Sequence, residues 1–307
     1  MSVSARSGDT EFEGRSLIGP FACPACGEQL ALMGDVGQSA CRNCGFVVSA
    51  HGGIPILVSD VDAVQRSIDE ASRGARASWY EDPQDVQLRG PYRHHVRKRI
   101  ALVRDVIQRY APAEGFDVGL DTGCGDGENL VWLSDQVREL YASDYNLQRL
   151  GRAASKGHAD QVVMADLTAY PAKDEAFDLV FCNHVLEHIT QIDRALGELH
   201  RILSRDGILI IGVPNEGAAF WRLAYRLAPE TRRNTDHVHF FTAASASSVC
   251  ARNGFEVLEV LPIGWGLPHW KLDSRVRAWK PVDDIFEFVG RRVIPGQATS
   301  LYLVLSK

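Results

Sequence analysis

Short apolar runs alternate with amphipathic segments through the middle of this 307-residue chain. The segments between the runs have the three- and four-residue apolar spacing of helices. A strand, a helix and a second strand in that order form a parallel pair, so the alternation predicts an α/β domain around a parallel sheet. The five runs are residues 117–121, 140–143, 161–164, 177–182 and 207–213.

The last two apolar runs, residues 255–260 and 301–306, are joined differently. The segment between them is rich in Trp and Pro and has no evident helical crossover. Antiparallel strands need no crossover, so we expect an antiparallel pair with an insertion at residues 262–298. The tryptophans of this insertion indicate an apolar pocket wall, and they are Trp265, Trp270 and Trp279.

A glycine-rich turn, DTGCGDG, follows the first of the five runs. Gly123, Gly125 and Gly127 alternate, which lets the backbone turn tightly and approach a ligand closely. The spacing differs from the dinucleotide-binding G-x-G-x-x-G, and Asp121 before the first glycine would repel a phosphate. A ligand that carries an ammonium group therefore fits better. After the turn we expect a helix whose apolar positions are Leu130, Leu133 and Val137.

Two further acidic residues follow the next two runs, Asp144 after the second and Asp166 after the third. The carboxyl ends of parallel strands line one crevice, where Asp144 can accept both hydroxyls of a ribose. Any one of these aspartates could equally be a helix cap or a turn residue. Three acids in order with the glycine turn indicate a ligand site.

These motifs, VGLDTGCGDGENL, YASDYN, VVMADL and FDLVFCNHVLEHI, resemble the class I S-adenosylmethionine-dependent methyltransferases. The closest resemblance is to the large group with VLEH after the fourth strand, and it covers residues 113–261 and the last strand. It implies a Rossmann-like sheet of order 3-2-1-4-5-7-6 with an antiparallel last strand. It also implies S-adenosylmethionine as cofactor: Gly123, Gly125 and Gly127 hold its methionine part, Asp121 faces its amino group, Asp144 binds the ribose, Asp166 and the Leu167 backbone bind the adenine, and Asn183 lies beside the methionine.

Methyl transfer from a sulfonium needs alignment of donor and nucleophile, and a hydroxyl or amine acceptor also needs a general base. His184 and His188 flank Glu187 and share one side of a helical turn, so this trio could supply a base or hold a divalent ion. A structural role for His188 as a cap of the next helix stays open. Resemblance to quinone O-methyltransferases with a similar VLEH segment also implies a metal ion near Glu187 and His188.

His237 and His239 are the second candidate pair. Side chains two residues apart point the same way in an extended segment, and Thr242 is expected to cap the following helix. The resemblance places this HxxxxT segment on the substrate side, so we expect base or substrate contact from one of the two histidines.

The segment 217–237 is expected to form a helix and a loop over the cofactor. Phe220, Trp221 and Tyr225 could wall off a substrate, or they could pack into the core. The arginines of the segment would suit a phosphate or carboxylate on the substrate, and they are Arg222, Arg226, Arg232 and Arg233.

Two CxxCG pairs lie near the N-terminus, separated by fourteen residues. This is the spacing of a four-thiolate zinc site, and four protein ligands leave no open position for catalysis. The region has only a small core, so a structural zinc would act as its staple. The predicted zinc ligands are Cys23, Cys26, Cys41 and Cys44.

A zinc ribbon ahead of such a domain resembles the ribosomal-RNA guanine methyltransferases, in which the zinc module helps to grip RNA. Residues 1–60 contain three arginines against six acidic residues, whereas an RNA clamp should be basic. The ribbon also resembles small methyltransferase partner proteins, which implies a fused stabilising or substrate-shaping module. The basic run 93–99 is either a solvated helix face or a nucleic-acid contact.

We therefore expect a methyltransferase that acts on a small molecule, by O-methylation of an anionic sugar, a quinone or a natural-product intermediate. An RNA base N-methyltransferase and a non-catalytic S-adenosylmethionine-binding scaffold are the alternatives. The formal charge of −6, the polar start and the lack of a long apolar run favour a cytoplasmic protein without a membrane partner, and they indicate no oligomeric state. The expected divisions are a flexible N-terminus (1–20), a zinc ribbon (21–60), a helical connector and lid (61–112) and the methyltransferase domain (113–307).

Overall fold

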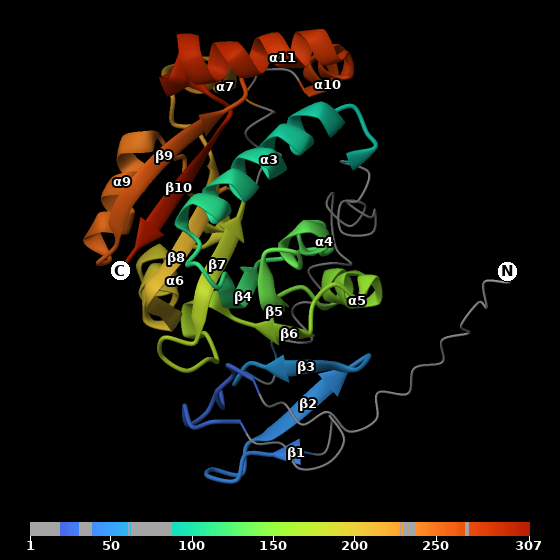
Figure 1. The fold of residues 1–307 in the computed structure, drawn as a ribbon, viewed down its shortest axis with the longest axis vertical. Helices are drawn as coiled ribbons and strands as arrows, with labels where there is room; N and C mark the ends of the chain where they lie inside the picture. The colour runs from blue at the N-terminus through green and yellow to red at the C-terminus, as the bar shows by residue number, and fades with distance from the viewer. Residues whose placement is uncertain are drawn as a thin grey trace, which may run out of the picture.

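The computed structural model describes residues 19–30, 39–60, 62, 88–227, 229, 237–267 and 270–307. Strands of this part form one sheet in the order β1-β2-β3-β6-β5-β4-β7-β8-β10-β9 (Figure 1). Their bounds are β1 (Ser39–Ala40), β2 (Val47–His51), β3 (Ile54–Leu57), β4 (Phe116–Thr122), β5 (Val137–Asp144), β6 (Gln161–Ala165), β7 (Phe177–Asn183), β8 (Leu203–Pro214), β9 (Glu256–Ile263) and β10 (Ser300–Ser306).

Helices connect most of these strands. The α-helices are α3 (Arg93–Tyr110), α4 (Leu130–Leu133), α5 (Leu147–Lys156), α6 (Ile192–Ile202), α7 (Ala219–Leu227), α9 (Ala243–Arg252), α10 (Trp270–Arg277) and α11 (Lys280–Phe288). The 3-10 helices are η2 (Leu167–Ala169), η3 (Leu186–His188) and η5 (Pro295–Gln297), and η4 (Val289–Val293) is a π-helix.

The central sheet confirms the predicted strand order. Strands β6, β5, β4, β7 and β8 run parallel, whereas β10 pairs antiparallel with both β8 and β9. The region between β4 and β10 therefore has the expected order 3-2-1-4-5-7-6, with the last strand inserted in the opposite direction.

The sheet is buried on both faces, so consecutive residues of one strand enter different cores. In β7, Leu179 and Phe181 pack in a core with α3, α4 and α5, whereas Val180 and Cys182 pack in a core with α6 and α9. Figure 1 shows these two groups of helices on opposite sides of the sheet. The carboxyl ends of the strands remain at one edge, where ligands bind in this type of fold.

The prediction of one helix through Leu130, Leu133 and Val137 is wrong for its second half. Helix α4 ends at Leu133, and Val137 is the first residue of β5. Val137 lies beside Gly119 of β4, where an added Cβ would come within 2.8 Å of Val137 Cγ1. The glycine thus makes room for a β-branched side chain on the sheet, which local spacing alone could not indicate.

The insertion between β9 and β10 is largely helical, although its sequence showed no helical crossover. Helices α10 and α11 are short and are stabilised by tertiary contacts. Arg277 is only 2% exposed and forms ion pairs with Asp273 at 2.9 Å and Asp283 at 2.8 Å. This buried arginine joins the two helices.

The basic run on α3 is only partly the solvated helix face that was one of the two predictions, since Arg97 is exposed and the other three cations of the run have partners. Arg93 donates to the Ala278 backbone oxygen, Lys98 pairs with Asp283 and Asp284, and Arg99 donates to Asn129. Most of these cations therefore fasten α3 to the insertion and to the main domain, because their partners come from α10–α11 and from the start of α4.

The ribbon is joined to the main domain by strand pairing and is not a separately packed domain. Strand β3 pairs parallel with β6, opposite Met164 and Ala165, and Phe21 forms an isolated bridge with Ala172. The Phe21 ring also meets that of Tyr141 edge-on, at 5.5 Å between centroids. The ribbon thus covers the free edge of the parallel sheet.

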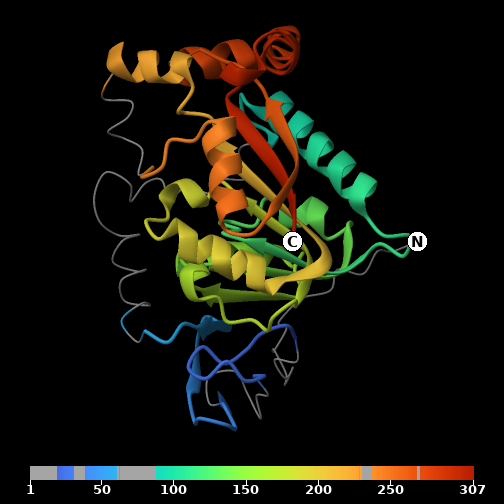
Figure 2. The ribbon, with the colours of Figure 1, turned by 90° about the vertical axis from the view of Figure 1, so that its left-hand side faces the viewer.

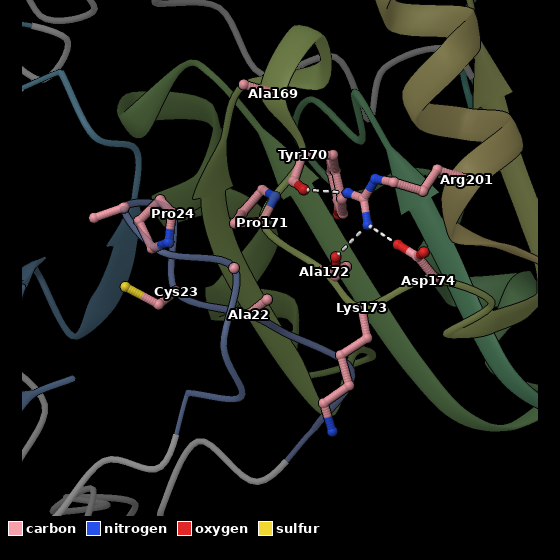
Figure 3. A pocket seen from close by; sticks show the side chains of 12 residues that line it. Ala22, Cys23, Pro24, Ala169, Tyr170, Pro171, Ala172, Lys173, Asp174 and Arg201 are labelled. Atoms are coloured by element: carbon pink, nitrogen blue, oxygen red, sulfur yellow. Dashed lines mark hydrogen bonds and ion pairs between the residues drawn. The ribbon is translucent and has the colours of Figure 1, made fainter. Parts of the chain in front are cut away.

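A hollow of about 490 Å³ lies along the seam between the first cysteine turn and the segment after η2 (Figure 3). Arg201 of α6 reaches into it and donates to the backbone oxygens of Tyr170 and Ala172 while pairing with Asp174 at 2.9 Å. The guanidinium of Arg201 is already bound by these groups. We therefore interpret the hollow as part of the contact between the ribbon and the sheet.

The four cysteines meet at one point in the ribbon. Sγ of Cys23 lies 3.6 Å from Sγ of Cys44, and Sγ of Cys26 lies 3.7 Å from Sγ of Cys41. Tetrahedral zinc with Zn–S bonds of about 2.3 Å requires sulfurs roughly 3.8 Å apart. The cluster therefore fits a structural zinc ion.

Removing the metal with a chelator, or replacing Cys41 with Ser, should unfold the ribbon and unpair β3 from β6. Structural zinc contributes about 10 kcal/mol or more to the folding of comparable peptides. We expect faster hydrogen exchange in peptides that cover β6, with protection retained in β10. The control Cys250→Ala, in a helix remote from the cluster, should keep its zinc. A metal-free protein with unchanged exchange and melting temperature would contradict the structural-zinc assignment.

Candidate functional site

The parallel strands bring the predicted cofactor residues to one edge of the sheet. Asp121 lies at the end of β4, Asp144 ends β5, Asp166 follows β6 and Asn183 ends β7. These positions are far apart in the sequence, and the parallel register of the strands aligns them.

The glycine turn after β4 adopts the predicted tight path. Gly123, Gly125 and Gly127 all have positive φ angles, of 71°, 55° and 76°. A Cβ on Gly123 would lie 2.2 Å from Cγ2 of Val185, so the turn can pack against the loop after β7 only with glycine there.

Asp121 is the most unusual acidic residue of the site. Its side chain is 1% exposed, and neither carboxylate oxygen has a hydrogen-bond partner within the described residues. Burial, and secondly the nearby charge of Asp144, raise the pKa of Asp121 well above its usual range. A buried carboxylate without a partner is costly, so it fits a ligand that brings a positive charge, as the ammonium group of a methionine does.

Asp144 and Asp166 carry structural bonds at the same edge. Asp144 accepts from the backbone N–H of Gly125 at 2.9 Å and of Asn146 at 2.8 Å, and so braces the glycine turn. Asp166 caps η2 by accepting from the backbone N–H of Thr168 at 2.8 Å. Carboxylate oxygens accept more than one hydrogen bond, so these contacts are compatible with the ribose and adenine roles.

The last two predicted cofactor contacts lie on either side of this edge. Leu167 begins η2 and is 8% exposed, next to the cap Asp166. The Asn183 amide oxygen accepts from the Tyr302 hydroxyl at 2.6 Å, which holds its side chain against β10.

The loop after β7 places His184 against Glu187. His184 has a φ of 55°, which is uncommon outside glycine, and its Nδ1 lies 3.1 Å from Glu187 Oε1. Burial alone would raise the pKa of Glu187, but the hydrogen bond and charge of His184 outweigh it and hold this pKa below its usual value. Glu187 is thus an ionised acceptor inside the protein, with 0% of its surface exposed.

His188 and His237 meet although the sequence presented them as members of separate pairs. Their rings lie 4.8 Å apart edge-on, and the ligand atoms of Glu187, His188 and His237 all lie within 4.8 Å of one another. His237 Nδ1 lies 2.5 Å from Glu216, which also accepts from the Tyr225 hydroxyl.

Glu216 was missed by the sequence analysis. It follows the end of β8, so the same strand-end pattern that singled out Asp121 and Asp144 could have found it. It is 9% exposed and binds both His237 and Tyr225.

His239 does not join this cluster. Its Nε2 lies 2.9 Å from the backbone oxygen of Ile189, and its ring is tilted over Phe241. The side chains of His237 and His239 therefore contact different groups, although both were expected to point to the same side of the extended segment. Thr242 confirms its predicted role, since it caps α9 in a reciprocal capping box with Ser245.

Aromatic side chains of α7 and of the insertion pack against one another. Phe220 of α7 lies 5.2 Å from Trp221 and 5.5 Å from Trp265 of the insertion, measured between ring centroids. Arg222 and Arg226 of the same helix are exposed, whereas Arg232 and Arg233 lie outside the described residues. Of the three tryptophans predicted to form a pocket wall, only Trp265 packs on Phe220 in the described structure. Trp279 is 67% exposed, and the side chain of Trp270 lies outside the described part.

The sequence profile of the methyltransferase domain family matches residues 92–260. The chain is 29% identical over 170 residues to a malonyl-[acyl-carrier protein] O-methyltransferase of Enterobacter lignolyticus, covering 55% of this chain and 59% of that protein. It is 28% identical over 198 residues to the mitochondrial arginine-hydroxylase NDUFAF5 of Danio rerio, covering 62% and 60%. The chain thus spans less than two thirds of the length of these relatives.

A similar solved structure is a complex between the Haloferax volcanii Trm112 methyltransferase activator and a methyltransferase. The match covers 76% of this chain and 98% of that one, with a TM-score of 0.54 and 19% sequence identity. At this identity the likeness concerns the fold alone.

Replacing Asp121 with Asn should weaken S-adenosylmethionine binding by roughly ten- to a hundredfold, because a charge-assisted contact is lost. Calorimetric titration at several pH values checks this. In the native protein, affinity should fall as the pH is lowered through the raised pKa of Asp121, since binding an ammonium requires the ionised form. The Asn variant should lose this pH dependence.

The same substitution should stabilise the ligand-free protein at neutral pH. A carboxyl whose pKa is raised by folding favours the fold at low pH and loses that contribution as the pH rises. The control Asp178→Asn, at the opposite end of β7, should leave cofactor affinity unchanged. Equal affinity of Asp121→Asn and the native protein would remove Asp121 from the site.

Proposed function

The chain belongs to the methyltransferase domain family, and on that premise we propose that it transfers the methyl group of S-adenosylmethionine to an oxygen of a small-molecule acceptor. The observation that carries this proposal is the buried carboxylate of Asp121, which has no hydrogen-bond partner among the described residues and lies beside three glycines with positive φ angles. These residues would hold the methionine part of the cofactor, Asp144 its ribose, and Asp166 with Leu167 its adenine. The bound cofactor would supply an activated methyl carbon.

His237 is the base that we assign to the acceptor. Glu216 lies 2.5 Å from its Nδ1 and orients the imidazole ring, and this side chain is suited to take a proton near neutral pH. Tyr225 also donates to Glu216 and fixes the carboxylate in place. A hydroxyl acceptor would give its proton to His237 as the oxygen attacks the methyl carbon.

The surroundings of His237 favour a small acceptor. Phe220, Trp221 and Trp265 form an aromatic wall that includes part of α7, the helix whose Tyr225 contacts Glu216, and such a wall suits a planar or apolar molecule. Methylation of RNA is the alternative hypothesis. The basic run 93–99 favoured it in the sequence, but Arg93 and Lys98 of that run bind the insertion.

A divalent ion is the alternative use of the same cluster. Glu187, His188 and His237 could together ligate one, and in the described part of the chain no group forms a hydrogen bond with the buried Glu187 Oε2. In that case the ion would polarise the acceptor oxygen. Turnover of the zinc-loaded protein would then depend on added Mg²⁺ or Mn²⁺, whereas a histidine base requires neither.

Labelling with methyl-labelled S-adenosylmethionine tests the acceptor class. The purified protein is incubated with a cell lysate that has been separated into RNA, protein and small-molecule fractions. We expect label in the small-molecule fraction, from which mass spectrometry identifies the acceptor. Label in RNA would establish the alternative hypothesis of RNA methylation, and cofactor binding without label in any fraction would support a non-catalytic scaffold.

A pair of glutamine variants tests the assignment of the base. His237→Gln should lower kcat by roughly a hundred- to ten-thousandfold and flatten the acidic limb of the pH profile, with unchanged cofactor affinity. His239→Gln is the matched control, because glutamine can still donate to the Ile189 oxygen. Equal losses of turnover in the two variants would contradict the assignment.

A further inference from the structure

Exposed apolar side chains gather at one end of the molecule. Of eleven large hydrophobic side chains that are exposed in the described part, eight lie on α7 or between α10 and the residue after η4. Figures 1 and 2 both place α7, α10 and α11 together at the end opposite the ribbon. The eight residues, which we call the apolar cap, are Leu223, Leu227, Leu272, Trp279, Ile285, Phe288, Val293 and Ile294.

On α7 and α11 the residues of the apolar cap occupy one face of the helix, at a spacing of four and three residues. On α11, Ile285 and Phe288 are exposed at 59% and 62%, three residues apart. Asp283 and Phe286 of the same helix point inward, toward the buried guanidinium of Arg277. The outer face therefore lacks a partner among the described residues, while the inner face is fully packed.

Exposed cations lie on the same helices as these side chains, in a protein whose formal charge is −6. Of the acids on α10 and α11, Asp273 and Asp283 are buried with Arg277, Asp284 pairs with Lys98 and Lys280, and Glu287 lies 3.7 Å from Arg291. The surface at this end is therefore basic as well as apolar. The exposed cations of α7, α10, α11 and η4 are Arg222, Arg226, Arg275, Lys280, Arg291 and Arg292.

Helix α7 connects this surface to the candidate site. Its exposed side carries Leu223 and Leu227, whereas Tyr225 contacts Glu216 and Trp221 packs on Phe220 of the aromatic wall. A molecule held at the cap would thus be separated from the histidine cluster by a single helix.

We propose that the apolar cap docks on an anionic lipid bilayer and presents the site to an acceptor dissolved in that bilayer. Exposed aromatic and aliphatic side chains on helices that also carry exposed arginines are typical of proteins that lie on a membrane surface, where the apolar groups enter the headgroup region and the cations meet anionic lipids. No helix among the described residues is long and apolar enough to cross a bilayer, so the contact is peripheral. The docking differs from the sequence-based expectation of no membrane partner, and its second half rests on the proposed methyl transfer.

Vesicle sedimentation with the full chain tests the docking. Vesicles of phosphatidylcholine with phosphatidylglycerol should bind the protein, vesicles of phosphatidylcholine alone should bind it less, and added salt should weaken binding. The double variant Ile285→Ser, Phe288→Ser should lower the partition coefficient by roughly tenfold or more. Val47→Ser, which removes an exposed side chain from the ribbon, should bind like the native protein.

Cofactor affinity measured on the same variants separates the two proposals. Unchanged S-adenosylmethionine binding with lost sedimentation supports the docking, whatever the acceptor proves to be. Absence of binding to anionic vesicles would overturn it. So would a double variant that sediments like the native protein, or one that changes only the oligomeric state in ultracentrifugation, which would assign the cap to a contact between protein chains.

Discussion

The parallel register of β4, β5 and β7 is the constraint on which the site depends. Thr122 lies opposite both Ser143 and Cys182, so the residues that end these strands emerge at one edge. The backbone N–H groups of Gly123 and Cys124 both donate to the Ser143 oxygen, which ties the glycine turn to β5. Because Val185 fills the space that a Cβ on Gly123 would need, the turn and the histidine loop are packed as one unit.

Electrostatic pairing distinguishes the acids of the site from one another. Asp126, in the same glycine turn, pairs with Arg152 at 2.8 Å, Glu187 pairs with His184, and Glu216 lies against His237. Asp121 alone among these four has no hydrogen-bond partner in the described structure. A buried charge is stable only when it is compensated, so Asp121 is the position at which a cationic ligand gains most.

The two ends of the sheet have been extended in different ways. At one end the ribbon adds β3 to β6 and brings four cysteines together in its small core, where they fit a zinc ion. At the other end the insertion is held by the Arg277 ion pairs and by Lys98 from α3, with its inner face packed and its outer face apolar and basic. The methyltransferase fold lies between them, so a single chain carries a covered sheet edge and a surface suited to a partner.

The amino-acid sequence by itself determined the alternation of strands and helices, the glycine turn, the acids at the strand ends and the two cysteine pairs, because each depends on local spacing. The strand order was expected only from the resemblance to a known family. Only the tertiary structure decided the rest. In the structure His188 contacts His237, whereas His239 binds elsewhere. Helix α4 ends at Leu133, and Lys98 of the basic run on α3 pairs with the insertion. Those outcomes depend on contacts between residues far apart in the chain, and the periodicity of one segment carries no information about its distant neighbours.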